Sequence, residues 1–258
     1  KKGRRNVEHA LLKAAASDPF WGVRREAVSG LANLKPKQYS DELMSLSEGQ
    51  DNRVRRAIWG ALKNYKDDPD VSIFLQNIIS TDPKYYSVSD AFRTLVVVDT
   101  AAARQKVDVL LNTNSHNDVI RRSAISYYGS VRNDKNYERL KELANYGGTT
   151  WDARSEAVTQ LGRYVKEKKE TVEFFVDLLD DRSRDIRRRA VSALGSHGNK
   201  EHLGHLDEVL SRDPIIGRDV RHARKRILNP PKKRPKTGLE KELEEANKKL
   251  EELKRILN

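Results

Sequence analysis

The sequence contains no cysteine, and this absence excludes disulfide bonds, thiolate nucleophiles and thiolate metal ligands. It also contains no run of about eighteen consecutive apolar residues, the length that a helix needs to cross a bilayer, so no membrane span is expected. Apolar residues make up 37% of the 258 residues and charged residues 34%. This balance suits a thin structure with a large surface for its volume better than a compact globule.

The net charge of +12 at pH 7 is spread unevenly along the chain. Residues 1–5 contribute +4, and residues 229–258 contribute +3 from nine Lys or Arg and six Glu, which leaves +5 for residues 6–228. A groove that binds DNA needs its basic residues concentrated on one face, and the body of this chain is only mildly basic. Nucleic acid is therefore not the partner that we expect.

The strongest pattern in the sequence is a repeat of 31 to 34 residues. Each repeat holds an aliphatic residue, usually followed by Arg, then Ala three or four positions later and a large apolar residue eight positions later. The aliphatic column consists of Val23, Val54, Val88, Ile120, Ala153, Ile186 and Val220. The Ala column consists of Ala27, Ala57, Ala91, Ala124, Ala157, Ala190 and Ala223. The large apolar column consists of Leu31, Leu62, Val96, Tyr128, Leu161, Leu194 and Leu228.

This spacing places the three side chains of each repeat on one stripe of an α-helix. A shorter apolar segment precedes each such helix, as at residues 10–15 and 71–79, and predicts the first helix of a hairpin. Asp or Asn residues lie between the two helices, where they can accept hydrogen bonds from free N–H groups, as in Asp18-Pro19, Asp82-Pro83 and Asp213-Pro214. The sequence therefore predicts an all-α solenoid of about seven HEAT-type helical hairpins.

Three segments follow from this pattern. The solenoid is predicted over residues 1–228, a Pro- and Lys-rich linker over 229–238, and an amphipathic helix over 239–258. The apolar face of this last helix has heptad spacing and consists of Leu239, Leu243, Ala246, Leu250, Leu253 and Leu257. A helix this short needs a partner, so we expect docking or self-association through residues 239–257. The chain begins at Lys1 without an initiator Met or a signal-like stretch, which suggests a fragment of a longer polypeptide.

One motif is more specific than a generic hairpin. Residues 18–27 read DPFWGVRREA, which resembles the first repeat of the C-terminal HEAT region in bacterial members of the zinc aminopeptidase N family. Residues 82–88, 146–148 and 179–188 and the Leu-rich tail are also similar to that region. The resemblance implies a parent metalloaminopeptidase in the bacterial cytoplasm or periplasm.

The chain itself lacks the catalytic parts of that family. No His is followed by Glu, so the zinc-binding His-Glu-x-x-His helix is absent, and the only Met, Met44, is not in a Gly-x-Met-Glu-Asn strand. We therefore expect no enzyme activity, catalytic residue, metal site or cofactor in this chain, with zinc held by the absent catalytic domain. The resemblance implies that the chain packs against that peptidase domain and limits substrate access.

The Arg that follows the aliphatic residue recurs in six of the seven repeats. This Arg ladder consists of Arg24, Arg55, Arg121, Arg154, Arg187 and Arg221. It could form a face that binds phosphate, because Arg binds phosphate oxygens bidentately. The structural interpretation, in which each Arg pairs with a turn Asp or carbonyl of an adjacent repeat, is favoured because carboxylates recur nearby. These carboxylates are Asp18, Asp51, Asp118, Asp152 and Asp185.

Two other groups have the composition of sites. His197, His202 and His205 lie close together, but no Asp, Glu or Cys completes a zinc ligand set, so a structural role is favoured. The three Trp residues, at 21, 59 and 151, fall at or near the starts of second helices, where packing is expected and peptide stacking is the alternative.

Three functions remain open from the sequence. The preferred one is an accessory domain of a zinc aminopeptidase, with the peptidase domain of the same polypeptide as partner. The second is a stand-alone scaffold that binds a protein or peptide on the concave face of the solenoid. The third is a HEAT-like DNA-binding module that uses the Arg ladder, which the modest charge disfavours.

Overall fold

The computed structural model describes residues 2–34 and 39–230. Within these ranges the chain forms fourteen α-helices, four short 3-10 helices and no β-strand. The first helices of the hairpins are α1 (Lys2–Ser17), α3 (Ser40–Ser45), α5 (Pro69–Thr81), α7 (Thr100–Leu111), α9 (Asp134–Ala144), α11 (Thr171–Asp177) and α13 (Leu203–Arg212). The second helices are α2 (Trp21–Leu34), α4 (Asn52–Leu62), α6 (Tyr85–Val98), α8 (Val119–Ser130), α10 (Trp151–Leu161), α12 (Arg184–His197) and α14 (Gly217–Leu228). The 3-10 helices are η1 (His116–Asp118), η2 (Leu178–Asp180), η3 (Lys200–His202) and η4 (Pro214–Ile216).

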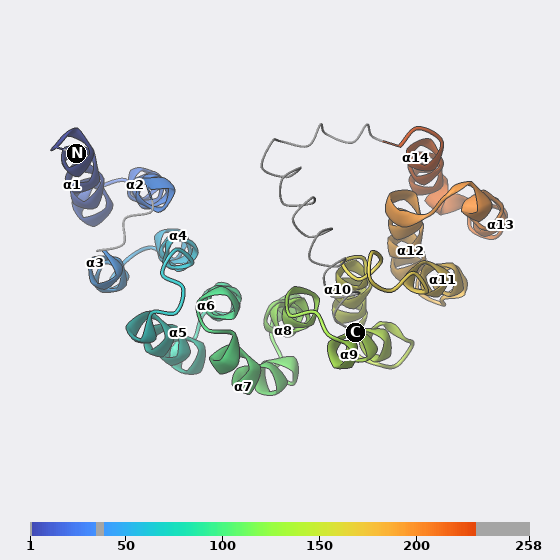
Figure 1. The fold of residues 1–258 in the computed structure, drawn as a ribbon, viewed down its shortest axis with the longest axis horizontal. Coiled ribbons are helices and arrows are strands. Elements are labelled where there is room, and N and C mark those ends of the chain that lie inside the picture. The colour runs from blue at the N-terminus through green and yellow to red at the C-terminus, as the bar shows by residue number, and fades with distance from the viewer. Residues whose placement is uncertain (1, 35–38, 231–258) are drawn as a thin grey trace, which may run out of the picture.

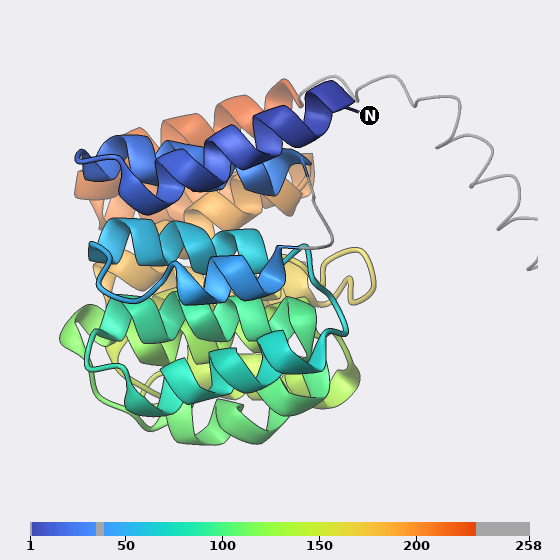
Figure 2. The same cartoon turned by 90° about the vertical axis from the view of Figure 1, so that its left-hand side faces the viewer.

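The hairpins follow one another around an arc (Figure 1). The second helices lie on its inner, concave side and the first helices on its outer side. Seen from the side, the helices run roughly parallel to one another across the array (Figure 2). This architecture confirms the predicted all-α solenoid and its seven hairpins. No helix among the described residues is both long and apolar enough to cross a membrane.

The curvature follows from unequal packing of the two layers. Each second helix contacts the next one along the chain, from α2 through α14, whereas contacts between successive first helices are sparse. The Ala column explains the close inner packing, because small side chains let neighbouring helices approach; an added Cβ at Gly195 would lie 2.7 Å from Cα of Ala223. The outer layer opens between α7 and α9, which border a hollow of about 1160 Å³.

The predicted columns lie mostly in a continuous core, and Val23 and Leu228, their exposed members, belong to the first and last hairpins. The aliphatic column is buried from Val54 to Val220, but Val23 in the first hairpin is 42% exposed. In the large apolar column, Leu161 and Leu194 are fully buried, whereas Leu228 in the last hairpin is 47% exposed. Each end residue lacks, within the described array, the neighbouring hairpin that covers its counterparts.

Trp59 does not lie at the start of a second helix, as the sequence suggested, but near the end of α4. It is fully buried, its ring lies 5.5 Å from that of Phe74, and its Nε1–H donates to Ser87 Oγ at 2.9 Å. Trp59 therefore joins the second hairpin to the third, and its role is packing. Trp21 and Trp151 do begin second helices, α2 and α10.

The predicted linker and final helix lie almost entirely outside the described residues. Of the linker, only Asn229 and Pro230 are described, directly after α14 ends at Leu228. The whole heptad face of residues 239–257 is outside the described ranges.

Candidate binding surfaces

Two Arg residues of the ladder form hydrogen bonds within their own hairpins. The Nε–H of Arg121 donates to the Leu111 carbonyl at 2.8 Å, and that of Arg154 to the Ala144 carbonyl at 3.1 Å. These carbonyls end the first helices α7 and α9, where no further N–H of the same helix can reach them. The Arg side chain therefore replaces missing helix hydrogen bonds and fixes the second helix against the first.

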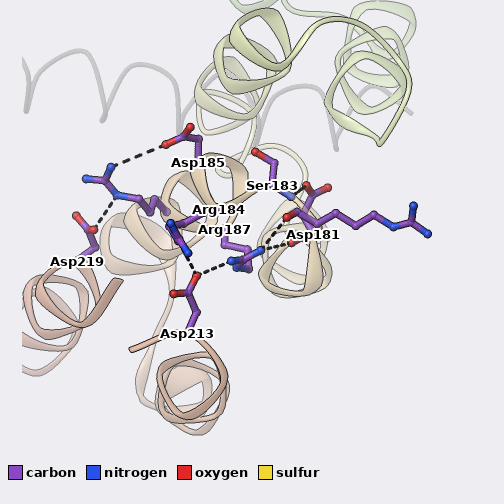
Figure 3. Close-up of polar contacts among 9 residues, drawn as sticks. Asp181, Ser183, Arg184, Asp185, Arg187, Asp213 and Asp219 are labelled. Atoms are coloured by element: carbon purple, nitrogen blue, oxygen red, sulfur yellow. Dashed lines mark hydrogen bonds and ion pairs between the residues drawn. The ribbon is translucent and has the colours of Figure 1, made fainter. Parts of the chain in front are cut away.

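Three ladder residues also form ion pairs with the next hairpin. Arg55 pairs with Asp82 at 2.5 Å, Arg154 with Asp181, and Arg187 with Asp213. Figure 3 shows Arg184 and Arg187 converging on Asp213. Arg184 Nε lies 3.2 Å from Asp213 Oδ2. Each acceptor comes from the turn of the following hairpin, so the pair joins neighbouring repeats.

The acceptor carboxylates also shape their own turns. Oδ1 of Asp82 accepts the N–H of Lys84 at 2.9 Å, and Oδ1 of Asp181 accepts the N–H of Ser183 at 2.8 Å. The second carboxylate oxygen is left for the Arg of the preceding hairpin. One Asp therefore holds a turn before a second helix and, at the same time, the contact between two repeats.

Two of these carboxylates have perturbed acidities. Burial would raise the pKa of Asp82, but the Lys84 N–H, the Ser87 hydroxyl and the Arg55 guanidinium outweigh it and lower the pKa. The hydrogen bond from Arg187, reinforced by Arg184, lowers the pKa of Asp213 against the opposing effect of burial. Both groups are therefore held in their ionised form by the contacts that join the repeats.

The other ladder positions depart from this arrangement. Arg24 donates to the Asp18 carbonyl at 2.6 Å and to Gln50 Oε1 at 2.8 Å. Arg121 pairs with Asp118 of its own hairpin. In the third hairpin Ser89 replaces the Arg. Arg221 is exposed and has no hydrogen bond or ion pair with any described residue.

The carboxylates that the sequence suggested as partners are mostly the wrong ones. Of the five, only Asp118 pairs with a ladder Arg. The local sequence directs attention to an Asp within a few residues, but the guanidinium reaches forward to the next hairpin. The spacing of 26 or 27 residues between Arg and acceptor, as in Arg154 and Asp181 or Arg187 and Asp213, was the signal that could have found them.

A second set of ion pairs crosses the concave face between neighbouring second helices. Its pairs are Arg56 with Asp90 at 2.5 Å, Arg122 with Glu156 at 3.4 Å and Arg188 with Asp219 at 2.9 Å. Their side chains are partly exposed, so each pair stabilises the fold by at most about 1 kcal/mol. Their position makes the inner surface polar and charged rather than apolar.

The concave face contains a hollow of about 290 Å³, lined only by residues of α8, α10, α12 and α14. Trp151 on its wall is 58% exposed. Arg122 Nε is buried there without a hydrogen-bond partner, and Arg189 uses only its Nε–H, which donates to Ser155 Oγ at 2.8 Å. The concave hollow therefore offers an aromatic surface beside the unused guanidinium donors of Arg189.

The histidines do not gather into a ligand set. His202 Nδ1 lies 3.1 Å from the backbone N of Asn199 and accepts its N–H at the start of η3. His197 packs beside Phe175, and burial lowers its pKa. His205 is exposed. In the described part of the chain, no three or more His, Asp or Glu side chains are placed to hold a metal ion.

Comparison with known families adds to this geometry. HEAT repeats match residues 8–96 and 147–227, more than half of the chain. The chain belongs to the HEAT-repeat family. No curated protein matches it. Arrays of HEAT repeats are typically non-catalytic scaffolds whose exposed surfaces bind other proteins. The kinship with aminopeptidases, drawn from residues 18–27, stays a prediction.

Proposed function

We propose that this HEAT-repeat array is a non-catalytic scaffold whose concave face encloses a segment of protein, and that this protein is the peptidase domain of a zinc aminopeptidase in the same polypeptide. In that setting the array limits which peptides reach the metal. The observation that carries the proposal is the concave hollow, whose lining includes the exposed Trp151 and Arg189, with the terminal guanidinium donors of Arg189 unused.

The chemistry of the hollow favours a peptide chain as occupant. An exposed Trp supplies a large apolar surface with little loss of conformational freedom, and Arg supplies donors for main-chain carbonyls or carboxylates. Trp and Arg are also the residues that contribute most to protein interfaces. The flanking hydroxyls of Ser155 and Ser192 add further polar contacts without bulk.

The choice of a peptidase domain rests on the resemblance of residues 18–27 and on nothing in the fold alone. DNA is a weaker candidate for the concave face. Five of the six ladder guanidiniums are already engaged by carboxylates or carbonyls inside the array, as Arg154 and Arg187 illustrate. A phosphate stripe would need these donors free.

The test uses the parent polypeptide, expressed with and without this array. We expect a His-Glu-x-x-His helix in the region before Lys1, and we expect loss of the array to change the ratio of kcat/KM for long over short peptides. In the intact protein, Trp151→Ala should shift that ratio in the same direction. Ile73→Ala, at an exposed apolar residue on the outer helix α5, is the matched control.

Two results would count against the proposal. A parent without a metallopeptidase motif would remove the peptidase part and leave a scaffold of another kind. An unchanged ratio in the Trp151→Ala protein would remove the concave hollow as the site. The isolated chain should not hydrolyse an aminoacyl reporter with or without added zinc, because its sequence holds neither the ligands nor the general base.

A further inference from the structure

The last hairpin of the described array carries side chains that contact the next hairpin in earlier repeats but have no such contact here. Arg154 and Arg187 each pair with a carboxylate of the following hairpin, but Arg221 at the same position has no partner among the described residues. Leu194 in the large apolar column is fully buried, whereas Leu228 is 47% exposed. The side of α14 that faces away from α12 therefore has the features of a repeat interface without the opposing hairpin.

The charge on this side of α14 has one sign. The helix contains five Arg or Lys and a single acid, Asp219, which pairs with Arg188 of α12. Arg218 and Lys225 are exposed and, like Arg221, have no ion pair with any described residue. Residues 218, 221 and 225 are spaced by three and four, so their side chains share one stripe of the helix.

Apolar side chains lie at both ends of this stripe. Ile215, in η4 directly before α14, is 71% exposed, and Leu228 closes the helix. A surface that only needed to be soluble would place polar residues at these two positions. Apolar anchors beside Arg are instead typical of the buried centre of a protein interface.

We propose that Ile215, Arg218, Arg221, Lys225 and Leu228 form a docking surface for a protein that stacks on α14 as a further hairpin would. The partner presents a carboxylate in a turn, which accepts from Arg221 as Asp181 does from Arg154, and an apolar side chain that covers Leu228. We call these five residues the α14 end surface. The inference goes beyond the concave face and does not depend on the peptidase proposal.

Charge complementarity favours this partner over two others. Phosphates of a nucleic acid would pair with the cations but leave Ile215 and Leu228 uncovered. A second copy of the chain could offer Asp18 and the exposed Val23 of its first hairpin, but residues 1–5 carry four positive charges that would repel the α14 end surface. An acidic surface on another protein meets neither objection.

The probe is a cross-linked helical-hairpin peptide with the sequence of residues 171–197, which carries the natural acceptor turn at Asp181. Its binding to the full chain is measured by fluorescence anisotropy at 50 and 200 mM salt. We expect binding that weakens at the higher salt, and that falls at least about tenfold in Arg218→Glu/Arg221→Glu protein. Asp181→Asn in the probe should weaken binding, and Arg93→Glu, at an exposed Arg of α6, should leave it unchanged.

Each other outcome overturns the proposal. No binding, or equal binding to the Asp181→Asn probe, removes the carboxylate contact. If a duplex DNA binds more tightly than the probe, and Arg218→Glu/Arg221→Glu abolishes that binding, the surface is a site for polyanions. If the chain self-associates as its concentration rises, and Asp18→Asn abolishes this association, the partner is a second copy. If the probe binds only to the Leu243→Glu/Leu250→Glu protein, the chain's own C-terminal segment is the occupant of the surface.

Discussion

Replacing Arg154 with alanine removes the most buried member of the Arg ladder, which is only 3% exposed. The change deletes the hydrogen bond to the Ala144 carbonyl and leaves the buried carboxylate of Asp181 without its cation. Removing one partner of a buried ion pair costs about 3–5 kcal/mol, because the other charge stays buried and uncompensated. We expect this loss in the free energy of unfolding, measured by urea denaturation with circular dichroism at 222 nm.

Arg221→Ala is the matched control, since the same ladder position has no partner among the described residues. An exposed side chain of this kind changes stability by at most about 0.5 kcal/mol. The Arg154→Ala/Asp181→Ala double variant should lose less than the sum of the single variants, because the pair is a coupled unit. If Arg154→Ala proved no more harmful than Arg221→Ala, the view that ladder Arg residues join the hairpins would be refuted.

Two further predictions test the packing and the charges. Gly195→Ala should destabilise the array by about 1–3 kcal/mol, because the new methyl would meet Cα of Ala223 at 2.7 Å and push α12 from α14. Gly60→Ala is the control, because nothing lies within 4 Å of the added Cβ. It should stabilise α4 by about 0.5–1 kcal/mol in the same urea assay. The pKa values of Asp82 and Asp213 are lower in the folded state than in the unfolded state, where they are about 4. The ionised carboxylates therefore stabilise the fold fully above about pH 4, and this stabilisation is lost as pH falls through the folded-state pKa values. Denaturation midpoints should therefore drop between about pH 5 and pH 3, and the drop should be shallower in Asp82→Asn. An unchanged slope in that variant would contradict the assignment.

The periodic columns were enough to predict the hairpins but not what their polar residues contact. The sequence placed Ala124, Ala157 and Ala190 on second helices, and all three are fully buried there. It also suggested Asp152 as a partner of Arg154, whereas the carboxylate that reaches Arg154 is Asp181. The burial of the Ala column depends on spacing within one helix, whereas the partner of Arg154 depends on how two hairpins are stacked.

The ends of the array show the same division. Val23 and Leu228 belong to columns whose other members are mostly buried, and nothing in their local sequence distinguishes them. Their exposure follows only from position, because no described hairpin lies beyond them. The concave hollow was likewise beyond sequence reasoning, since Arg122, Trp151 and Arg189 come from three different helices.

The sequence by itself determined the all-α class, the period, the number of hairpins and which helix of each carries the Ala column. These are properties of local spacing, since the 3.6-residue turn of a helix decides which side chains share a face. Only the tertiary structure decided the curvature of the arc, the pairing of each ladder Arg and the surfaces left open at Trp151 and Arg221. Those depend on the rotation and distance between successive hairpins, which all contacts across each interface set together.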